Sequence, residues 1–287
     1  MLASPPQRFH QRAVGGAVIP IATPVTKGGG VDFGGLGKLA LWAVSEGVEG
    51  IFVAGTTGRF SHFSPEDNGE ICRAVVDAVG GAVTIYGGIC DSGLRRMLAN
   101  AERMRKAGAD YVVTTGPFYL SRLAEEAEAD LLAVADRSPL PVIYYNLPEF
   151  VGYGLRAEWI AEAARHANVA GYKDSSDDSE HFNEVLARTR GEDFAVLIGK
   201  ERLVESALRC GAEGLVVSLL MVEPDPFVSL VKHARVGDWE AAAQEQRRVQ
   251  QIIADFKKVF EQRPVFSTLM QYLESKLRER GIAVRLL

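Results

Sequence analysis

Cysteine is scarce in this chain of 287 residues, and no long apolar stretch is present. The three cysteines, Cys72, Cys90 and Cys210, are odd in number and lack the close spacing of metal or redox sites. Such sparse use of cysteine is typical of a reducing compartment, so we expect a cytoplasmic protein. The longest apolar stretch lies within 214–222, far short of the ~20 residues that a membrane-spanning helix needs.

A strong excess of one charge is also lacking. The chain carries 32 Lys and Arg residues against 37 Asp and Glu residues, a formal net charge of -5, which gives no basic footprint for nucleic acid. Residues 1–14 contain no apolar core of a secretory signal peptide. The five histidines are scattered, without an H-E-x-x-H pair. We therefore expect no nucleic-acid partner, no membrane partner, no metal and no organic cofactor.

What the chain does contain is a series of short apolar runs rich in β-branched residues. Each run is continuously apolar rather than alternating, which is typical of parallel strands covered on both faces. Because eight such runs occur, the sequence predicts eight strands. They lie at 17–23, 50–55, 82–88, 110–116, 141–146, 169–173, 194–199 and 213–218.

The segments between the runs have the apolar spacing of amphipathic helices. Examples are 36–46, 65–79, 94–107 and 157–166. Ser64 and Pro65 have the residue types of a helix N-cap and first turn, and Gly108 that of a C-cap. Alternation of strand and helix, eight times, predicts an α/β fold of the (β/α)8 TIM-barrel type, with a doubly wound open sheet as the structural alternative.

The length of 287 residues is sufficient for one barrel and an additional helical region. We expect the barrel, with a short N-terminal extension, over 1–225. A C-terminal helical region packed on the barrel is expected over 226–287, because 239–260 and 267–280 have helical spacing.

Lys173 is the most informative single residue, because it ends the sixth run, and barrels of this kind carry their chemistry at the C-terminal ends of the strands. Apolar neighbours remove solvation from an ammonium group and so favour the neutral, nucleophilic amine. Such an amine attacks a ketone to form a Schiff base. The alternative is a surface lysine in a turn, paired with Asp174.

Tyr145 ends the neighbouring fifth run, where its phenol would shuttle protons. Tyr144 alternates to the opposite face, so one of the two tyrosines points inward. The alternative is an aromatic side chain that packs in the mouth of the barrel with its hydroxyl bonded to the backbone.

The loop Gly55-Thr56-Thr57-Gly58 joins a predicted strand to a helix. Glycines let the backbone approach a ligand, and successive N–H groups with hydroxyls hold a carboxylate. An ordinary strand-to-helix turn is the alternative. Arg59 follows the loop and would bind an acidic group of a substrate, although an ion pair with Glu66 or Asp67 is the simpler interpretation.

Residues 35–40 match G-x-G-x-x-A, a pattern of nucleotide-binding loops. The match is isolated, and Gly35 falls where the first helix should begin. A nucleotide-binding domain is therefore a poor alternative. Cys90 follows a strand end and could face the mouth of the barrel, although a small core residue is the simpler interpretation.

Four motifs follow successive predicted strands, in order. They are GTTG at 55–58, PFY at 117–119, YYNLP at 144–148 and GYKDSS at 171–176. Together they resemble the dihydrodipicolinate synthase / N-acetylneuraminate lyase superfamily, whose class I lyases form a Schiff base with pyruvate. The resemblance covers nearly the whole chain, from Gly16 to at least Val222, and favours the catalytic interpretation at each motif.

The resemblance implies a role for each matching residue. Lys173 would be the Schiff-base lysine for pyruvate or another 2-keto acid, and Tyr145 the general acid and base. Thr56 would relay the proton through its hydroxyl to Tyr119, which in the family reaches in from a neighbouring subunit. A homotetramer arranged as a dimer of dimers is therefore implied. Thr57 would hold the keto-acid carboxylate with its backbone N–H and hydroxyl. The positions of Gly199 and Val216 match those that line the keto-acid pocket.

Three positions depart from the family pattern. Synthases of the lysine precursor carry an arginine two residues after the proline of Y-N-x-P, and this chain has Phe150 there. A phenyl ring cannot donate hydrogen bonds to the carboxylate of a second substrate. Arg59 replaces the usual Glu after GTTG, and Met221 replaces the usual Asn after the eighth strand. These changes argue against dihydrodipicolinate synthase activity and leave the pyruvate half intact.

We therefore expect a Schiff-base lyase whose partners are a small 2-keto acid and an aldehyde. Condensation of pyruvate with an aldehyde, cleavage of a 2-keto-3-deoxy sugar acid and dehydration of such an acid use the same imine, so all three stay open. Arg59 with Phe150 would fit a substrate with an acidic end and an apolar portion. Dihydrodipicolinate synthase and a non-catalytic 2-keto-acid-binding barrel are the alternatives.

Overall fold

Eight parallel strands close into a barrel in the computed structural model, which describes residues 13–287. The strands are β1 (Gly16–Pro20), β2 (Gly50–Val53), β3 (Thr84–Gly88), β4 (Tyr111–Thr114), β5 (Val142–Asn146), β6 (Val169–Asp174), β7 (Ala195–Ile198) and β8 (Gly214–Val216). Strand β8 pairs with β1 in register Ala17 to Leu215 and so closes the sheet. The predicted (β/α)8 barrel is confirmed, and the open sheet is not formed.

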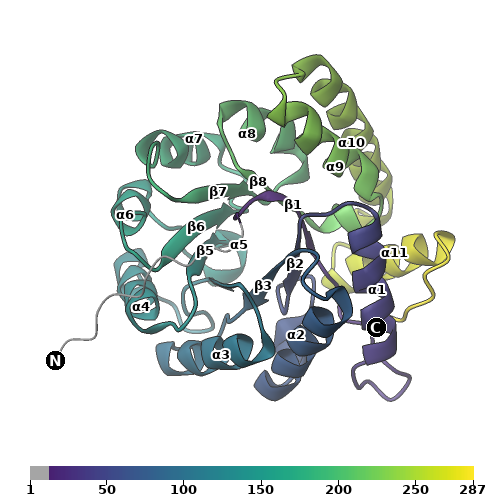
Figure 1. The fold of residues 1–287 in the computed structure, drawn as a ribbon, viewed down its shortest axis with the longest axis horizontal. Helices are drawn as coiled ribbons and strands as arrows, with labels where there is room; N and C mark the ends of the chain where they lie inside the picture. Colours follow the sequence, from purple (N-terminus) through teal and green to yellow (C-terminus); the bar gives the residue numbers. More distant parts are fainter. Residues whose placement is uncertain (1–12) are drawn as a thin grey trace.

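Helices surround the barrel, as Figure 1 shows. The ring comprises α1 (Phe33–Ser45), α2 (Pro65–Val79), α3 (Leu94–Ala107), α4 (Ala124–Arg137), α6 (Ala157–Ala163), α7 (Ser179–Arg188), α8 (Val204–Cys210) and α9 (Pro224–Arg235). Shorter helices follow several strands: α5 (Pro148–Val151) after β5, and the 3-10 turns η1 (Phe60–His62), η2 (Glu201–Leu203) and η3 (Ser218–Met221). No helix in the described part of the chain is long and apolar enough to cross a membrane.

The helix ends follow from local side-chain chemistry. Helix α2 begins where predicted, because the Ser64 hydroxyl accepts from the backbone N–H of Asp67 at 3.0 Å while the Asp67 carboxylate accepts from the Ser64 N–H at 3.1 Å. Helix α1 begins three residues earlier than expected. Asp32 caps it by accepting from the N–H of Gly35 at 2.9 Å, so the apparent nucleotide motif lies inside an ordinary helix.

The C-terminal segments behave largely as expected. Helix α10 (Trp239–Phe260) has the predicted bounds, and α11 (Phe266–Glu279) starts one residue early and ends one residue early. The predicted boundary after residue 225 falls inside α9, which packs on β1 and completes the ring, while α10 packs along α9 and α8. The expected N-terminal extension lies mostly in residues 1–12, outside the described part of the chain.

Side chains of the strands alternate between two apolar layers. The inward layer fills the barrel and consists of Val18, Phe52, Tyr86, Tyr111, Val113, Ile143, Tyr145, Leu147, Ala170, Leu197 and Val216. The outward layer packs against the helices and forms the larger cluster. Both faces of each strand are therefore buried, which explains why the strands are continuously apolar.

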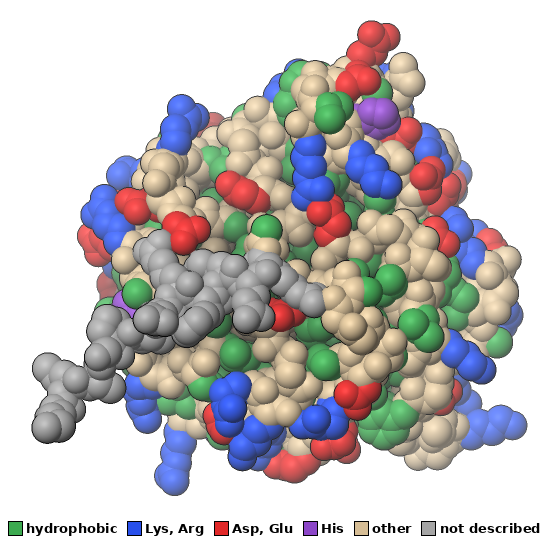
Figure 2. Space-filling view, viewed as in Figure 1, with side chains coloured by type: hydrophobic (Ala, Val, Ile, Leu, Met, Phe, Trp, Pro, Cys, Tyr) green, Lys and Arg blue, Asp and Glu red, His purple; other side chains and the backbone are tan. Residues whose placement is uncertain are grey.

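Most charged side chains lie at the periphery, whereas Glu128, Lys173 and Asp174 are buried. Figure 2 shows Lys and Arg side chains interspersed with Asp and Glu around the rim of the face in view, without a broad field of either sign. Most of the ion pairs lie on the outer surfaces of the helices, such as Arg188 with Glu184 and Glu158. Such exposed pairs contribute little to stability, so the two apolar layers hold the fold.

Candidate active site at the C-terminal end of the barrel

Lys173 lies inside the mouth of the barrel, near the end of β6. It is 5% exposed, and the register of β5 and β6 places it directly beside Tyr145. Its Nζ lies 3.8 Å from the centroid of the Tyr145 ring and 5.4 Å from that of Phe52. A primary amine is therefore held among aromatic faces and out of bulk water.

The alternative interpretation required an ion pair between Lys173 and Asp174. The structure does not form this pair. Successive residues of a strand point to opposite faces, and the Asp174 Oδ1 accepts instead from the N–H of Ser176 at 2.6 Å and from Asn146 Nδ2 at 3.4 Å. The other carboxylate oxygen is buried and has no hydrogen-bond partner in the described structure. Burial raises the pKa of Asp174. Lys173 is a strand lysine that faces inward, and not a turn lysine.

Tyr144 and Tyr145 point to opposite sides of β5, as predicted. The Tyr144 hydroxyl donates to the carbonyl of Leu131 at 3.0 Å, outside the barrel and against α4. Tyr145 belongs to the inward layer. Of the two phenols, it is Tyr145 that lies next to the amine of Lys173.

The loop after β2 is held in a tight, fixed conformation. Ala54 has a φ of 51°, in the left-handed region, and a Cβ at Gly55 would lie 2.6 Å from the Phe52 ring. Thr57 is buried, and its Oγ1 lies 2.7 Å from the Oγ of Ser218. The loop is thus tied across the mouth to the start of η3. Ser218 ends the eighth predicted strand, and that position was the available signal for this partner.

Gly199 lies beside Lys173 in a space that admits no side chain. A Cβ there would lie 2.0 Å from Ser175 Oγ, 2.7 Å from the carbonyl oxygen of Asp174 and 3.2 Å from Lys173 Cε. Val216 lies deeper, in the inward layer, and together with Lys173 it lines a small void of about 10 Å³. Both residues therefore surround the lysine, Gly199 at its side and Val216 below.

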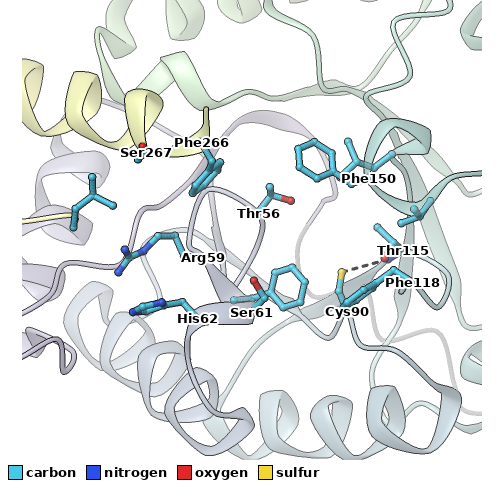
Figure 3. Close-up of a pocket in the computed structure, with 14 residues that line it drawn as sticks. Thr56, Arg59, Ser61, His62, Cys90, Thr115, Phe118, Phe150, Phe266 and Ser267 are labelled. Carbon is cyan, nitrogen blue, oxygen red and sulfur yellow. Dashed lines mark hydrogen bonds between the residues drawn. The ribbon is translucent and has the colours of Figure 1, made fainter. Parts of the chain in front are cut away.

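A cavity of about 440 Å³ lies among the residues that follow several of the strands (Figure 3). It is lined by Thr56, Arg59, Phe60, Ser61, His62, Cys90, Thr115, Phe118, Leu147, Phe150, Val151, Phe266, Ser267 and Leu287. Leu147 belongs both to this lining and to the inward layer that contains Tyr145. Burial raises the pKa of the Cys90 thiol, and the charge of Lys173 opposes that rise, so the lysine lies near this wall. The volume suits a small molecule.

Arg59 does not form the ion pair that was the simpler interpretation, so that expectation is wrong. Glu66 pairs with Arg103, and Asp67 is engaged in capping α2. The Arg59 guanidinium lies 5.5 Å from the centroid of the Phe63 ring, and its Nε and Nη2 are enclosed without a hydrogen-bond partner in the described structure. Desolvation lowers the pKa of Arg59 from its usual high value.

Phe150 and Tyr119 occupy the outer margin. Phe150 lies on α5, lines the cavity and is 61% exposed. Tyr119 is 91% exposed, and its φ of 85° holds it in the left-handed region on the loop after β4. Its neighbour Phe118 lines the cavity instead. The predicted relay brings Tyr119 to Thr56 from a neighbouring subunit, and it stays a prediction.

The structure adds several polar groups that sequence reasoning did not assign to the site. Thr115 and Cys90 line the cavity side by side, and the Thr115 N–H donates to the Cys90 sulfur at 3.4 Å. Glu201 accepts from the N–H of Leu219 at 3.2 Å, and burial raises the pKa of Glu201. Residues 13–287 contain no group of three or more His, Cys, Asp or Glu side chains that could hold a metal ion.

The chain matches the model of a protein family over most of its length. The model of the Dihydrodipicolinate synthetase family matches residues 13–280. The chain belongs to this family. Membership confirms the predicted resemblance and the prediction of a class I lyase on a (β/α)8 barrel.

Named relatives in the dihydrodipicolinate synthetase family are moderately similar to the chain. A 4-hydroxy-tetrahydrodipicolinate synthase of Haloarcula marismortui is 32% identical over 222 residues, covering 77% of this chain and 72% of that protein. A protein of the same name from Natronomonas pharaonis is 36% identical over 200 residues, covering 70% and 68% respectively.

Solved structures of the family share the architecture. YagE, a prophage protein of the dihydrodipicolinic acid synthase family from Escherichia coli K12 in complex with pyruvate, is 25% identical with a TM-score of 0.87, covering 96% of this chain and 91% of that one. A 2-keto 3-deoxygluconate aldolase from Picrophilus torridus has a TM-score of 0.84 at 21% identity and covers 96% of both chains. The latter shows likeness of fold alone.

Proposed function

We propose that the protein is a Schiff-base lyase that handles pyruvate, or a longer 2-keto acid, together with an aldehyde. One observation carries the proposal. The amine of Lys173, buried in the barrel mouth, lies 3.8 Å from the centroid of the Tyr145 ring, so a nucleophile and a phenol meet where barrels of this kind carry their chemistry.

The first step forms an imine. The neutral Nζ of Lys173 attacks C2 of the keto acid, the carbonyl oxygen takes up protons and leaves as water, and a protonated imine remains. The hydroxyl and backbone N–H of Thr57 hold the keto-acid carboxylate. Its hydroxyl is already oriented by the 2.7 Å contact with Ser218. Gly199 leaves the space that the new bond requires beside the lysine.

The second step breaks or makes a bond to carbon. In cleavage, Tyr145 removes the proton of the substrate hydroxyl, the C–C bond breaks, and its electrons pass into the imine to give an enamine and a free aldehyde. In dehydration, the imine acidifies C3, loss of a C3 proton gives an enamine, and the enamine electrons expel the C4 hydroxyl, which takes up a proton and leaves as water. The imine itself is the electron sink, so the reaction needs no added cofactor.

Tyr119 supports a proposal about assembly. It is 91% exposed in one chain, near the exposed side chains Leu120 and Leu123 on the same loop. We propose that a neighbouring subunit covers this loop and receives Tyr119 beside its own Thr56, within a homotetramer arranged as a dimer of dimers. The three free cysteines support a reducing, cytoplasmic setting.

The outer cavity supports a second reactant with an acidic end and an apolar portion. Arg59 offers an enclosed guanidinium with two nitrogens that have no hydrogen-bond partner within residues 13–287, and Phe150 offers an aromatic face. A guanidinium is suited to bidentate contact with a carboxylate. A 2-keto-3-deoxy acid, or the aldehyde released from it, meets this description.

Trapping with borohydride tests the proposal. The protein is incubated with pyruvate and borohydride and then digested, and we expect a reduced pyruvate adduct on the peptide that contains Lys173. An adduct that is absent, or that lies on another lysine, would contradict the Schiff-base mechanism. It would then favour a non-catalytic 2-keto-acid-binding barrel.

Dihydrodipicolinate synthase is the second candidate, favoured by the names of the relatives. Phe150 speaks against it, because a phenyl ring at the position of the synthase arginine cannot donate hydrogen bonds to the carboxylate of aspartate semialdehyde. We expect little condensation of pyruvate with aspartate semialdehyde in the natural protein, and a gain of that activity in Phe150→Arg. Robust activity in the unaltered protein would establish the synthase instead.

A further inference from the structure

A buried hydrogen bond joins two segments on one side of the outer cavity. The hydroxyl of Tyr153 donates to the carbonyl of Pro117 at 2.9 Å. Pro117 directly precedes Phe118 on the loop after β4. Tyr153 follows α5 by two residues, and α5 carries Phe150. Phe118 and Phe150 both line the cavity, and Figure 3 shows them on the side away from Arg59. The bond therefore connects the two segments that supply this aromatic side.

The backbone beside Pro117 is shaped to receive the Tyr153 hydroxyl. A Cβ at Gly116 would lie 2.1 Å from the Tyr153 hydroxyl oxygen and 3.0 Å from Ala127 Cβ on α4. Tyr153 is 9% exposed, and burial raises the pKa of its phenol, so the hydroxyl keeps the proton that it donates. The contact depends on a glycine at position 116 and on a phenol at position 153.

The segment that carries Tyr153 is fixed on its other side. The N–H of Leu155 donates to Asn146 Oδ1 at 3.1 Å, and the N–H of Arg156 donates to Glu128 Oε1 at 3.1 Å. Asn146 ends β5, and Glu128 is a buried residue of α4. The segment is thus held to the barrel and to the helix ring, so Tyr153 gives the loop after β4 a firm point of attachment.

The loop after β4 needs such an attachment, because its middle projects outward. It runs from residue 115 to residue 123, between the end of β4 and the start of α4. Tyr119, Leu120 and Leu123 are all exposed, and Tyr119 has a φ of 85°. A loop that is held in its binding arrangement costs a ligand less free energy than one that must be ordered on binding.

We propose that Tyr153 is a positioning residue that sets the separation of Phe118 and Phe150 and so helps to select the second reactant. The inference rests on the proposed function, because it concerns the reactant that meets the imine on Lys173. Tyr153 packs in the outward layer and not in the cavity lining, so it acts through the two phenylalanines. When the bond is lost, the binding arrangement is less populated, and the apparent affinity falls by the same factor.

The test compares Tyr153→Phe with Tyr144→Phe. Both variants remove a buried hydroxyl that donates to a backbone carbonyl, that of Pro117 in one case and that of Leu131 in the other. We expect similar losses of thermal stability. Only Tyr153→Phe should raise KM for succinic semialdehyde, a probe with an acidic end and an apolar portion, by about fivefold with kcat little changed. KM for acetaldehyde, which offers only a methyl group to the cavity walls, should change less.

Gly116→Ala perturbs the same contact from the other side. Its methyl group would overlap the Tyr153 hydroxyl, so we expect KM for succinic semialdehyde to rise in this variant as well. In the Tyr153→Phe background the hydroxyl oxygen is gone, and Gly116→Ala should then add less than it does alone. Fully additive effects of the two substitutions would contradict the proposal that they act on one contact.

Borohydride trapping of pyruvate on Lys173, measured in parallel, should be the same in all variants as in the natural protein. The positioning proposal is overturned, and the Schiff-base proposal stands, if Tyr153→Phe leaves KM for succinic semialdehyde unchanged or if Tyr144→Phe raises it equally. The same holds if trapping is normal but neither aldehyde reacts. If trapping fails in the natural protein, both proposals fall.

Discussion

The inner and outer parts of the candidate site are built differently. The inner part, with Lys173, Tyr145, Thr57 and Gly199, comes from the strands and the residues that directly follow them, and every one of these positions is buried or closely enclosed. The outer cavity draws on loops, the short helices η1 and α5, the start of α11 and the chain end at Leu287. Its residue Phe150 is 61% exposed.

This difference explains how a barrel of this kind can keep its reaction while its second substrate changes. A position fixed by sheet register cannot move without disturbing two neighbouring strands, whereas a loop residue can be replaced at little cost to the fold. The departures from the family pattern fall outside the strands, at Arg59, Phe150 and Met221. On the proposed function, the inner part carries the chemistry and the outer part selects the aldehyde.

Lys173→Met should have the largest effect, because it removes the nucleophile. We expect kcat to fall by at least about 10³-fold and pyruvate trapping to disappear. Lys200→Met, at the neighbouring end of β7, serves as the control and should keep both. Trapping that survives in Lys173→Met would place the imine on another lysine.

Tyr145→Phe tests whether the inner phenol moves protons. The ring remains to pack beside Lys173, so we expect normal stability and a fall in kcat of about 10²-fold or more. The matched control is Tyr144→Phe, which loses the bond to Leu131 and should lose about 1 kcal/mol of stability without a change in kcat. Equal kcat values for the two variants would contradict the assignment. Rapid-mix kinetics and thermal unfolding supply the two readouts.

Gly199→Ala tests the fit around the lysine. Because the new methyl would collide with Ser175 Oγ and the Asp174 carbonyl, we expect a loss of stability of about 1–3 kcal/mol and slower imine formation. Gly93→Ala is the control, since a methyl group there meets no atom within 4 Å. Thermal denaturation and the rate of pyruvate trapping measure the two effects. A fully active, stable Gly199→Ala would show that the lysine has more room than the geometry gives it.

Arg59→Gln should have the smallest effect and should act on the outer part alone. We expect trapping of pyruvate to be unchanged and KM for a carboxylate-bearing aldehyde to rise by about tenfold, with little change for an uncharged aldehyde. Arg103→Gln, which removes the partner of Glu66, is the control for a surface arginine. A uniform rise in KM for both aldehydes would show that Arg59 only supports the loop.

Much of the barrel could be predicted from the sequence, because its signals are local. Continuous apolar runs revealed the strands, and the capping residues at Ser64 and Gly108 marked helix ends. Lys173 and Tyr145 were found because each ends a run, and strand ends converge at one face of a barrel. Helix 157–166 proved shorter, ending at Ala163, because the chain turns there toward β6.

The remainder depends on contacts between distant segments. Arg59 was expected to pair with nearby acids, but Arg103 from the next helix takes Glu66 instead. The pairing of Thr57 with Ser218 joins residues 161 positions apart, and the bond from the Tyr153 hydroxyl to the Pro117 carbonyl forms only when the segments after β4 and β5 are assembled. No local pattern carries such information.

A crystal structure of the protein after treatment with pyruvate and borohydride tests the central claim most directly. The account predicts electron density continuous with Lys173 Nζ, with the pyruvate carboxylate bound at Thr57 and the outer cavity unchanged. Pyruvate bound in the outer cavity, or linked to a different lysine, would contradict the division of the site into an inner part for chemistry and an outer part for selection.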